Sequence, residues 1–265
     1  MKIEGKRILL TGAGGGIGSH LAGILAAKGA RLALVDRNNQ NLERHPGLND
    51  DPPLILSVDL LDNQARNAAI DQAMTHLGGI DLLINNAGMM SFRPFHEEDP
   101  EILQRVVQLN TLVPMQLSHR VLPYMLEQGC GRIVNVGSTF GSIAFAWFAA
   151  YSTSKFGLRG FSEALRRELA HTGVGVTYVA PRAVKTKLNS SAVYRMAETV
   201  KMNMDEPEWV AARIVESIER ERDEVYLGFP ESLFVRINSV WPRLVDGAMK
   251  KQNLKMMAFA KGPTS

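Results

Sequence analysis

The sequence predicts a doubly wound α/β fold, in which helices cover both faces of a mostly parallel sheet. Short apolar runs that suit strands alternate with longer segments that suit helices along most of the chain. The runs are continuously apolar, which is typical of strands buried on both faces of a parallel sheet. No repeat, low-complexity segment or linker interrupts the pattern, so the 265 residues are expected to form a single domain.

Each element rests on its own pattern. The first strand, 6–12, is an apolar run that ends in glycine, and after it Leu21, Ile24 and Leu25 stand at helical spacing within 18–28. The later strands repeat the first pattern, at 29–36, 53–59, 80–88, 131–138, 173–181 and 223–227. Further helices are expected between them, at 63–77, 100–126, 151–171 and 207–222.

Composition excludes several classes of protein. Hydrophobic residues make up 45% of the chain and charged residues 22%, an ordinary globular composition that argues against disorder. The single cysteine, Cys130, cannot form an internal disulfide, so a reducing, cytoplasmic location is expected. No apolar run approaches the roughly 18 residues of a membrane-spanning helix, and the N-terminus is a poor signal peptide.

Charge is unevenly distributed along the chain. The formal net charge is +3, yet residues 232–265 hold six Lys or Arg and one acidic residue, Asp246. The main body, 1–231, is slightly acidic, so it gives no support for nucleic-acid binding. We therefore expect 1–231 to form the core and 232–265 to be a basic extension of the same domain.

The segment "TGAGGGIG" at 11–18 follows the first predicted strand and opens the first predicted helix. Gly12 permits a tight turn, while Gly16 and Gly18 allow close approach to the backbone. The helix N-terminus offers N–H groups and partial positive charge to phosphates. Asp36 ends the second strand, where an acid can accept hydrogen bonds from adenosine ribose hydroxyls. Together these features favour a Rossmann-type dinucleotide site over a merely flexible turn.

The wider set of motifs resembles the short-chain dehydrogenase/reductase family. "TGAGGGIG", "NNAG" at 85–88, Asn110, Ser138 and Tyr151-x-x-x-Lys155 occur in the family's order and at its intervals, across at least residues 6–186. The resemblance implies an enzyme that transfers a hydride between NAD(P) and an alcohol or carbonyl compound. It also implies a homodimer or homotetramer in which the helices near 100–126 and 151–171 pair between subunits. No metal site is expected.

Four residues form the expected catalytic set. Lys155 stands one helical turn after Tyr151, and a cation there should favour the phenolate and lower the pKa of Tyr151 toward neutrality. The resemblance implies that Lys155 also holds the nicotinamide ribose. Ser138 is expected to hydrogen-bond the substrate oxygen, and Asn110 resembles the family residue that supports a water-linked proton relay. The alternatives are a strand-end cap for Ser138, a helix-satisfying amide for Asn110 and a core residue for Tyr151.

The resemblance further implies a set of cofactor contacts. Asp59 resembles the acid that contacts the adenine amino group, although an N-cap of the following helix is an equal alternative. Thr186 stands where a family threonine often contacts the carboxamide. The complete set of expected cofactor residues is Gly12, Gly15, Gly16, Ile17, Gly18, Asp36, Arg37, Asp59, Leu60, Asn86, Ala87, Gly88, Tyr151, Lys155, Pro181, Val184 and Thr186.

Two positions bear on how the cofactor is held. The carboxylate of Asp36 should repel a 2′-phosphate, so NAD is the preferred cofactor; Arg37 beside it could grip that phosphate, which keeps NADP as the alternative. After the sixth strand the family usually has Pro-Gly, whereas this chain has Pro181-Arg182. Arg182 could face a phosphate, an anionic substrate or solvent, with solvent preferred.

Aromatic residues between Ser138 and Tyr151 suggest an apolar substrate. Phe140, Phe145, Trp147 and Phe148 are expected at the pocket mouth, the alternative being that they pack in the core or at a subunit interface. Residues 187–206 resemble the family's variable substrate loop, in which Tyr194, Met196, Met202 and Met204 would form an adaptable lid. An apolar ketone or secondary alcohol is the expected substrate class, with acyl-chain, steroid-like and aromatic compounds all open.

Two other classes of function are alternatives to an enzyme. A nucleotide-binding redox sensor normally shows a damaged Tyr/Lys pair, which this chain does not. A membrane-surface or partner scaffold would act through the basic tail. In the tail, apolar residues recur at 233/234, 237, 240/241, 244/245 and 248/249, as in an amphipathic helix, and Pro242 should kink or divide it. The stripe could lie on an anionic membrane or pack on the domain or a neighbouring subunit.

Overall fold

The computed structural model of the protein describes residues 1–38 and 52–261. Within these residues seven parallel strands form one sheet in the order β3-β2-β1-β4-β5-β6-β7. The strands are β1 (Arg7–Thr11), β2 (Arg31–Asp36), β3 (Leu54–Ser57), β4 (Leu82–Asn85), β5 (Gly131–Val136), β6 (Val174–Ala180) and β7 (Glu224–Tyr226). The doubly wound, Rossmann-type fold predicted from the sequence is confirmed. Its strand order reverses between β1 and β4, which is where such sheets bind ligands.

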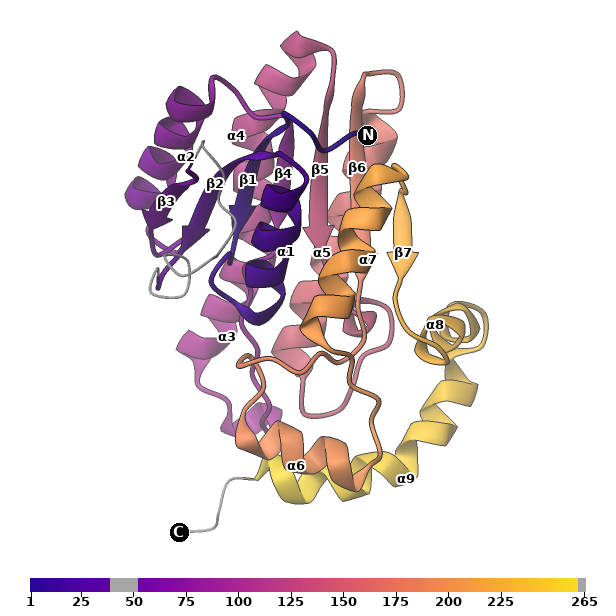
Figure 1. Ribbon diagram of the computed structural model, residues 1–265. Coiled ribbons are helices and arrows are strands. Elements are labelled where there is room, and N and C mark those ends of the chain that lie inside the picture. Colours follow the sequence, from indigo (N-terminus) through magenta and orange to yellow (C-terminus); the bar gives the residue numbers. More distant parts are fainter. Residues whose placement is uncertain (39–51, 262–265) are drawn as a thin grey trace.

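Helices cover both faces of this sheet (Figure 1). α1 (Gly16–Ala27) and α7 (Pro207–Glu219) pack over one apolar cluster. α2 (Asn63–Leu77), α4 (Val113–Gln128) and α5 (Ala149–Glu168) pack over a second cluster on the opposite face. The strands between them are almost completely buried, which explains their continuous apolar runs.

The helix predicted over 100–126 is divided. α3 (Pro100–Val107) is followed by a π-helical segment, Gln108–Leu112, and then by α4. Pro114 has no N–H to donate to the carbonyl of Asn110, so regular helical bonding cannot continue there. Such π segments often occur at functional sites, and this one contains Asn110.

Three more helices lie beyond the carboxyl ends of the strands. α6 (Ser191–Thr199) belongs to the predicted substrate loop, and α9 (Pro242–Ala260) crosses next to it (Figure 1). α8 (Glu231–Val240) is separated from α9 at Trp241-Pro242, so the predicted division of the tail is confirmed. None of the helices described here is long and apolar enough to cross a membrane.

Only part of the predicted apolar stripe packs on the domain: Ile237, Val245 and Met249 are partly buried. Val240, Trp241 and Leu244 are all more than 60% exposed, whereas Val235 and Met256 are buried. Periodicity showed that the tail is helical, but the residues of the stripe at the α8–α9 break stay exposed, and Val235 and Met256, which lie outside the stripe, are the buried ones.

Candidate functional site

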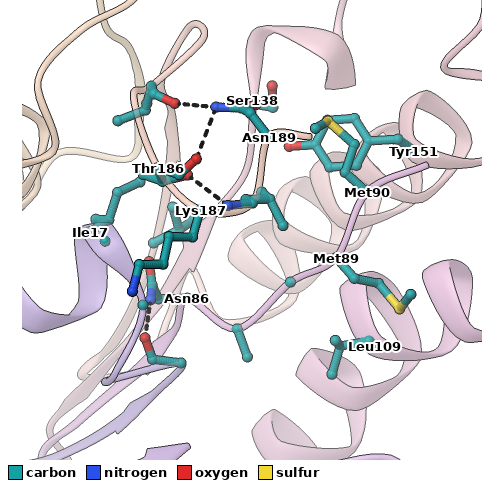
Figure 2. A pocket seen from close by; sticks show the side chains of 18 of the residues that line it. Ile17, Asn86, Met89, Met90, Leu109, Ser138, Tyr151, Thr186, Lys187 and Asn189 are labelled. Carbon is teal, nitrogen blue, oxygen red and sulfur yellow. Dashed lines mark hydrogen bonds between the residues drawn. The ribbon is translucent and has the colours of Figure 1, made fainter. Parts of the chain in front are cut away.

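A pocket opens at the carboxyl edge of the sheet, where β1 and β4 meet (Figure 2). Every residue predicted to contact the cofactor lines this pocket except Gly18. Ile17, Asn86 and Thr186 lie on one side, and Tyr151 lies on the other with Met90 (Figure 2). The motifs therefore converge in one cavity although they come from distant parts of the chain.

The glycines of the turn at 11–18 allow close contacts that a side chain would block. Gly12 has a φ of +65°, and a Cβ there would lie 2.7 Å from the Cα of Ala87. A Cβ on Gly16 would lie 2.6 Å from the Thr186 side chain. Gly18 serves the packing of α1 rather than the cavity, since a Cβ there would lie 1.9 Å from the carbonyl oxygen of Gly12. Larger residues would force this turn apart.

The N-terminus of α1 suits an anion. Its N-cap residue is Gly15, and no side chain caps the helix there. The first-turn N–H groups and the partial positive charge of the helix are thus directed at a pocket edged by glycine. The residues present fit the pyrophosphate of a dinucleotide.

Asp36 stands at the end of β2 beside this turn. One carboxylate oxygen accepts a hydrogen bond from Gly14 N at 2.9 Å, and the other accepts from Asn38 N at 3.0 Å. Asp36 and Arg37 both line the pocket. A negative and a positive side chain therefore flank the place where a ribose would lie against the glycine turn.

Asp59 and Leu60 line the same end of the pocket. Asp59 accepts a hydrogen bond from Leu61 N at 3.0 Å, but it does not cap the following helix. The N-cap of α2 is Asp62, which accepts from the N–H groups of Gln64 and Ala65. The N-cap alternative for Asp59 is therefore wrong.

Ser138, Tyr151 and Lys155 meet at the centre of the pocket. All three are buried, with exposures of 5–8%. The ammonium group of Lys155 donates to the carbonyl of Val136 at 2.9 Å and lies 5.8 Å from the centre of the Tyr151 ring. Ser138 follows β5, and its hydroxyl accepts from Phe140 N at 3.1 Å, capping the short 3₁₀ turn Thr139–Gly141. Ser138 therefore acts as the strand-end cap of the alternative interpretation and also lines the pocket.

The expected lowering of the Tyr151 pKa toward neutrality is wrong, because burial outweighs the other influences on this phenol. Burial raises the pKa of Tyr151 to about 12, and a hydrogen bond with Ser138 offsets only part of that rise. Burial also lowers the pKa of Lys155, to about 8. Helical spacing places the two side chains together, but desolvation disfavours the charged form of each. The phenol is therefore protonated at neutral pH.

Tyr178 supports Ser138 from β6 and was not found by sequence reasoning. Its hydroxyl donates to the carbonyl of Ser138 at 3.2 Å. Gly137 and Gly141 leave room for its ring, since a Cβ on either would lie within 2.6 Å of the Tyr178 hydroxyl. A tyrosine in a buried strand carries no distinguishing sequence signal, whereas the two glycines nearby could have suggested a close contact.

Asn110 is fully buried beside the pocket rather than lining it. Its side chain accepts from Met89 N at 2.9 Å and donates to Met89 O and to the hydroxyl of Ser154. A Cβ on Gly88 would lie 3.2 Å from the Asn110 side-chain oxygen and 3.8 Å from the Lys155 nitrogen. The bare backbone at Gly88 thus keeps space between Asn110 and Lys155.

Arg182 does not face solvent, so the preferred expectation for it was wrong. Its guanidinium group pairs with Asp205 at 2.7 Å and with Glu231 at 2.9 Å. It also donates to the carbonyl of Phe229. Because these three partners come from the end of the substrate loop and from the residues just before the tail, Arg182 ties both segments to the end of β6 at the pocket edge.

The substrate side of the pocket is apolar, but only part of the predicted lining is present. Phe140 and Phe148 line the cavity. Phe145 and Trp147 pack behind it in the same cluster, and the hydroxyl of Tyr194 donates to the carbonyl of Thr186, so these three do not line it. The lining that sequence reasoning missed or described only as a lid is Met89, Met90, Leu109, Val193, Met196 and Met202.

Comparisons with known proteins agree with this geometry. The family model for short chain dehydrogenases matches residues 6–197. The chain is 31% identical to the ketoacyl reductase HetN of Nostoc sp. over 253 residues, covering 92% of this chain and 88% of that protein.

Solved structures are similar over most of their length. A short-chain dehydrogenase from Burkholderia cenocepacia in complex with NADP has a TM-score of 0.78 and 25% identity, covering 94% of this chain and 99% of that one. A 3-ketoacyl-(acyl-carrier-protein) reductase from Brucella melitensis complexed with NADH has a TM-score of 0.78 and 26% identity, covering 87% and 99%. The chain therefore belongs to the short-chain dehydrogenase/reductase family and is an NAD(P)-dependent oxidoreductase.

Proposed function

We propose that the protein transfers a hydride between NAD and an apolar ketone or secondary alcohol. The observation that carries this proposal is the junction of a buried Ser138–Tyr151–Lys155 set with a chamber of aromatic and methionine side chains. Polar groups at one point of an otherwise apolar cavity suit a carbonyl or hydroxyl on an apolar body.

The nucleotide would lie along the side of the pocket formed by the glycine turn. The N-terminus of α1 would hold the pyrophosphate, Asp36 the adenosine ribose, and Asp59 with Leu60 the adenine. Lys155 would hold the nicotinamide ribose. When bound, the nicotinamide supplies the hydride chemistry. The carboxylate of Asp36 supports NAD as the preferred form, although Arg37 stands next to it.

The protein's own residues would donate the proton to the substrate oxygen and hydrogen-bond that oxygen. Because burial holds the pKa of Tyr151 at about 12, its phenol is a proton donor for a carbonyl oxygen as that oxygen gains negative charge. Ser138 would donate a second hydrogen bond to the same oxygen. The Lys155 ammonium and the space at Gly88 beside Asn110 would let a proton return to Tyr151 through water. In alcohol oxidation the same transfers run in reverse.

The shape of the chamber supports a long apolar substrate. Flexible methionines at 90, 196 and 202 line it together with Phe140 and Phe148. Two of the similar proteins are described as ketoacyl reductases. Within the apolar ketone class, acyl-chain ketones are therefore our first choice.

The test is a screen of ketones and alcohols of graded chain length, followed by nicotinamide absorbance. Tyr151→Phe should lower turnover by about 10²- to 10⁴-fold while cofactor affinity changes only a few-fold. Tyr124→Phe, at an exposed position on α4, is the matched control and should leave turnover unchanged. Undiminished turnover in Tyr151→Phe would contradict the mechanism.

We also propose how the protein assembles and where it works. Leu112, Met115 and Phe156 are exposed around α4 and α5, which supports a homodimer or homotetramer paired through these helices. Phe156→Arg should then reduce the particle mass in analytical ultracentrifugation. A free, exposed Cys130 suits the reducing cytoplasm. Contact with membranes would be peripheral, through the C-terminal segment 232–265.

A further inference from the structure

The tail exposes an unusual amount of apolar surface. Among the described residues, six large apolar side chains are more than 60% exposed, and five of them lie between 229 and 254. Three of the five, Val240, Trp241 and Leu244, adjoin the break between α8 and α9, with Leu233 and Phe234 exposed one to two turns earlier. The name tail surface is used below for Leu233, Phe234, Val240, Trp241 and Leu244 together. The α8–α9 break lies at the outer edge of the molecule (Figure 1).

Positive side chains surround the tail surface. Arg236, Arg243, Lys250 and Lys255 are exposed on the same two helices. None of these four forms an ion pair with any residue that the structure describes. Of the acidic residues on these helices, Glu231 is paired with Arg182, which leaves Asp246. The surface thus combines apolar and cationic groups with little internal neutralisation.

The other side of these helices is fixed to the domain. Met256 is fully buried and Phe259 partly buried in the cluster that contains Tyr151, Val193 and Met196. The indole nitrogen of Trp147 donates to the carbonyl of Asn253 at 3.3 Å. The exposed residues therefore belong to folded helices, and one of these helices, α9, packs behind the chamber wall formed by Val193 and Met196.

We propose that the tail surface docks on an anionic lipid bilayer. Aromatic and aliphatic side chains at the α8–α9 break would enter the interface, while the surrounding Arg and Lys side chains meet lipid phosphates. A second copy of this chain is a poorer occupant, because a two-fold contact through this surface would bring the same unpaired cations together. Docking would place α9, together with α6, which it contacts and which lines the chamber, at the bilayer, where an apolar carbonyl substrate is dissolved; this last step rests on the proposed function.

Binding is tested with the full-length protein and vesicles of phosphatidylcholine, with and without phosphatidylglycerol. We expect co-sedimentation only with the anionic vesicles, and its loss as salt is raised. The double variants Trp241→Ser/Leu244→Ser and Arg236→Gln/Arg243→Gln should each lower partitioning by about tenfold or more. Phe95→Ser is the matched control, because Phe95 is 67% exposed and Trp241 62%, yet Phe95 lies outside the tail.

Three results would overturn the docking surface. The first is failure of the wild type to sediment with anionic vesicles at low salt. The second is a loss of vesicle binding in Trp241→Ser/Leu244→Ser that is no greater than the loss in Phe95→Ser. The third is a change of oligomer size in Trp241→Ser/Leu244→Ser, which would assign the surface to a second copy. Turnover of a short water-soluble ketone should be the same in all variants. If the wild type lacks that turnover but still sediments, the proposed function fails and the docking surface stands.

Discussion

At the scale of single residues, Lys155 shows how strongly burial governs this site. The residue is only 5% exposed, and the carbonyl of Val136 is a weak substitute for water around the full charge of its ammonium group. The pKa of the lysine falls from 10.5 to about 8 as a result. The folded protein keeps this destabilising charge where a bound dinucleotide would need it, so function and stability oppose each other at this residue.

The first prediction concerns the pH dependence of stability. A lysine whose pKa is lower in the folded state disfavours folding below about pH 8, and this cost disappears as pH rises from about 8 to 10.5. Wild type should therefore gain about 2 to 3 kcal/mol relative to Lys155→Met between pH 7 and pH 10. Urea unfolding of both proteins without cofactor measures the difference. Tyr151 is present in both, so its own titration cancels, and a gap independent of pH would contradict the buried charge.

Asp36 is the residue at which cofactor choice can be tested. Asp36→Asn removes the charge but keeps one oxygen that can accept from Gly14 N or Asn38 N. We expect weaker NADH binding and a shift of at least about tenfold in the affinity ratio toward NADPH, since repulsion of the 2′-phosphate is lost. Fluorescence titration with both cofactors measures the ratio.

A second variant isolates the source of that shift. Asp36→Asn/Arg37→Ala should lose the gain toward NADPH, because Arg37 is the cation left to attract the phosphate. A wild-type protein that already prefers NADPH would show that Arg37 outweighs Asp36.

At the scale of elements, the site depends on segments held together across the sequence. The substrate loop is closed at its base by backbone bonds of Asp205 to Ala183 and Lys185. The Asp205 carboxylate pairs with Arg182, which also holds Glu231 at the start of α8. The sequence showed only that Arg182 replaces a family glycine; its partners stand at 205 and 231, and no periodic pattern links such distant positions.

Arg182→Met tests this clamp. Removing the guanidinium leaves the nearly buried carboxylate of Asp205 without its cation, so we expect a loss of about 3 kcal/mol in stability and a higher KM for substrate. Lys185→Met, which breaks an exposed pair with Glu206 nearby, should cost less than about 1 kcal/mol. Thermal unfolding and steady-state kinetics measure both effects. Equal losses of stability in the two variants would mean that the ion pairs of Arg182 contribute no more than an exposed surface pair and do not hold the two segments together.

At the scale of the whole molecule, sequence patterns predicted the parallel sheet and most of the nucleotide end of the pocket. This succeeded because Gly12, Asp36, Asn86 and Ser138 lie at or within two residues of the carboxyl ends of strands, and the carboxyl ends of parallel strands share one edge. The substrate end was predicted less well. Met89 and Met90 come from the backbone after "NNAG", and α9, from the far end of the chain, packs behind the chamber wall formed by Val193 and Met196. The periodicity of apolar residues in the tail predicts an apolar helix face, but it does not predict which part of the domain that face packs against.

The packing of α9 is the last property to test, since the tail can be a membrane-docking segment only if its inner side is part of the fold. Met256→Ala should cost about 2–5 kcal/mol, because it opens a cavity in the cluster beneath α6. Leu254→Ala, two residues away but 67% exposed, should cost less than about 0.5 kcal/mol. Urea unfolding of both variants gives the comparison. Met256→Ala should also raise the KM for short substrates more than for long ones, since Val193 and Met196, which line the chamber, lose a packing partner and hold a short chain less tightly. Two neutral variants would mean that α9 is detached in solution, and the chamber wall at Val193 and Met196 would then lack its outer support.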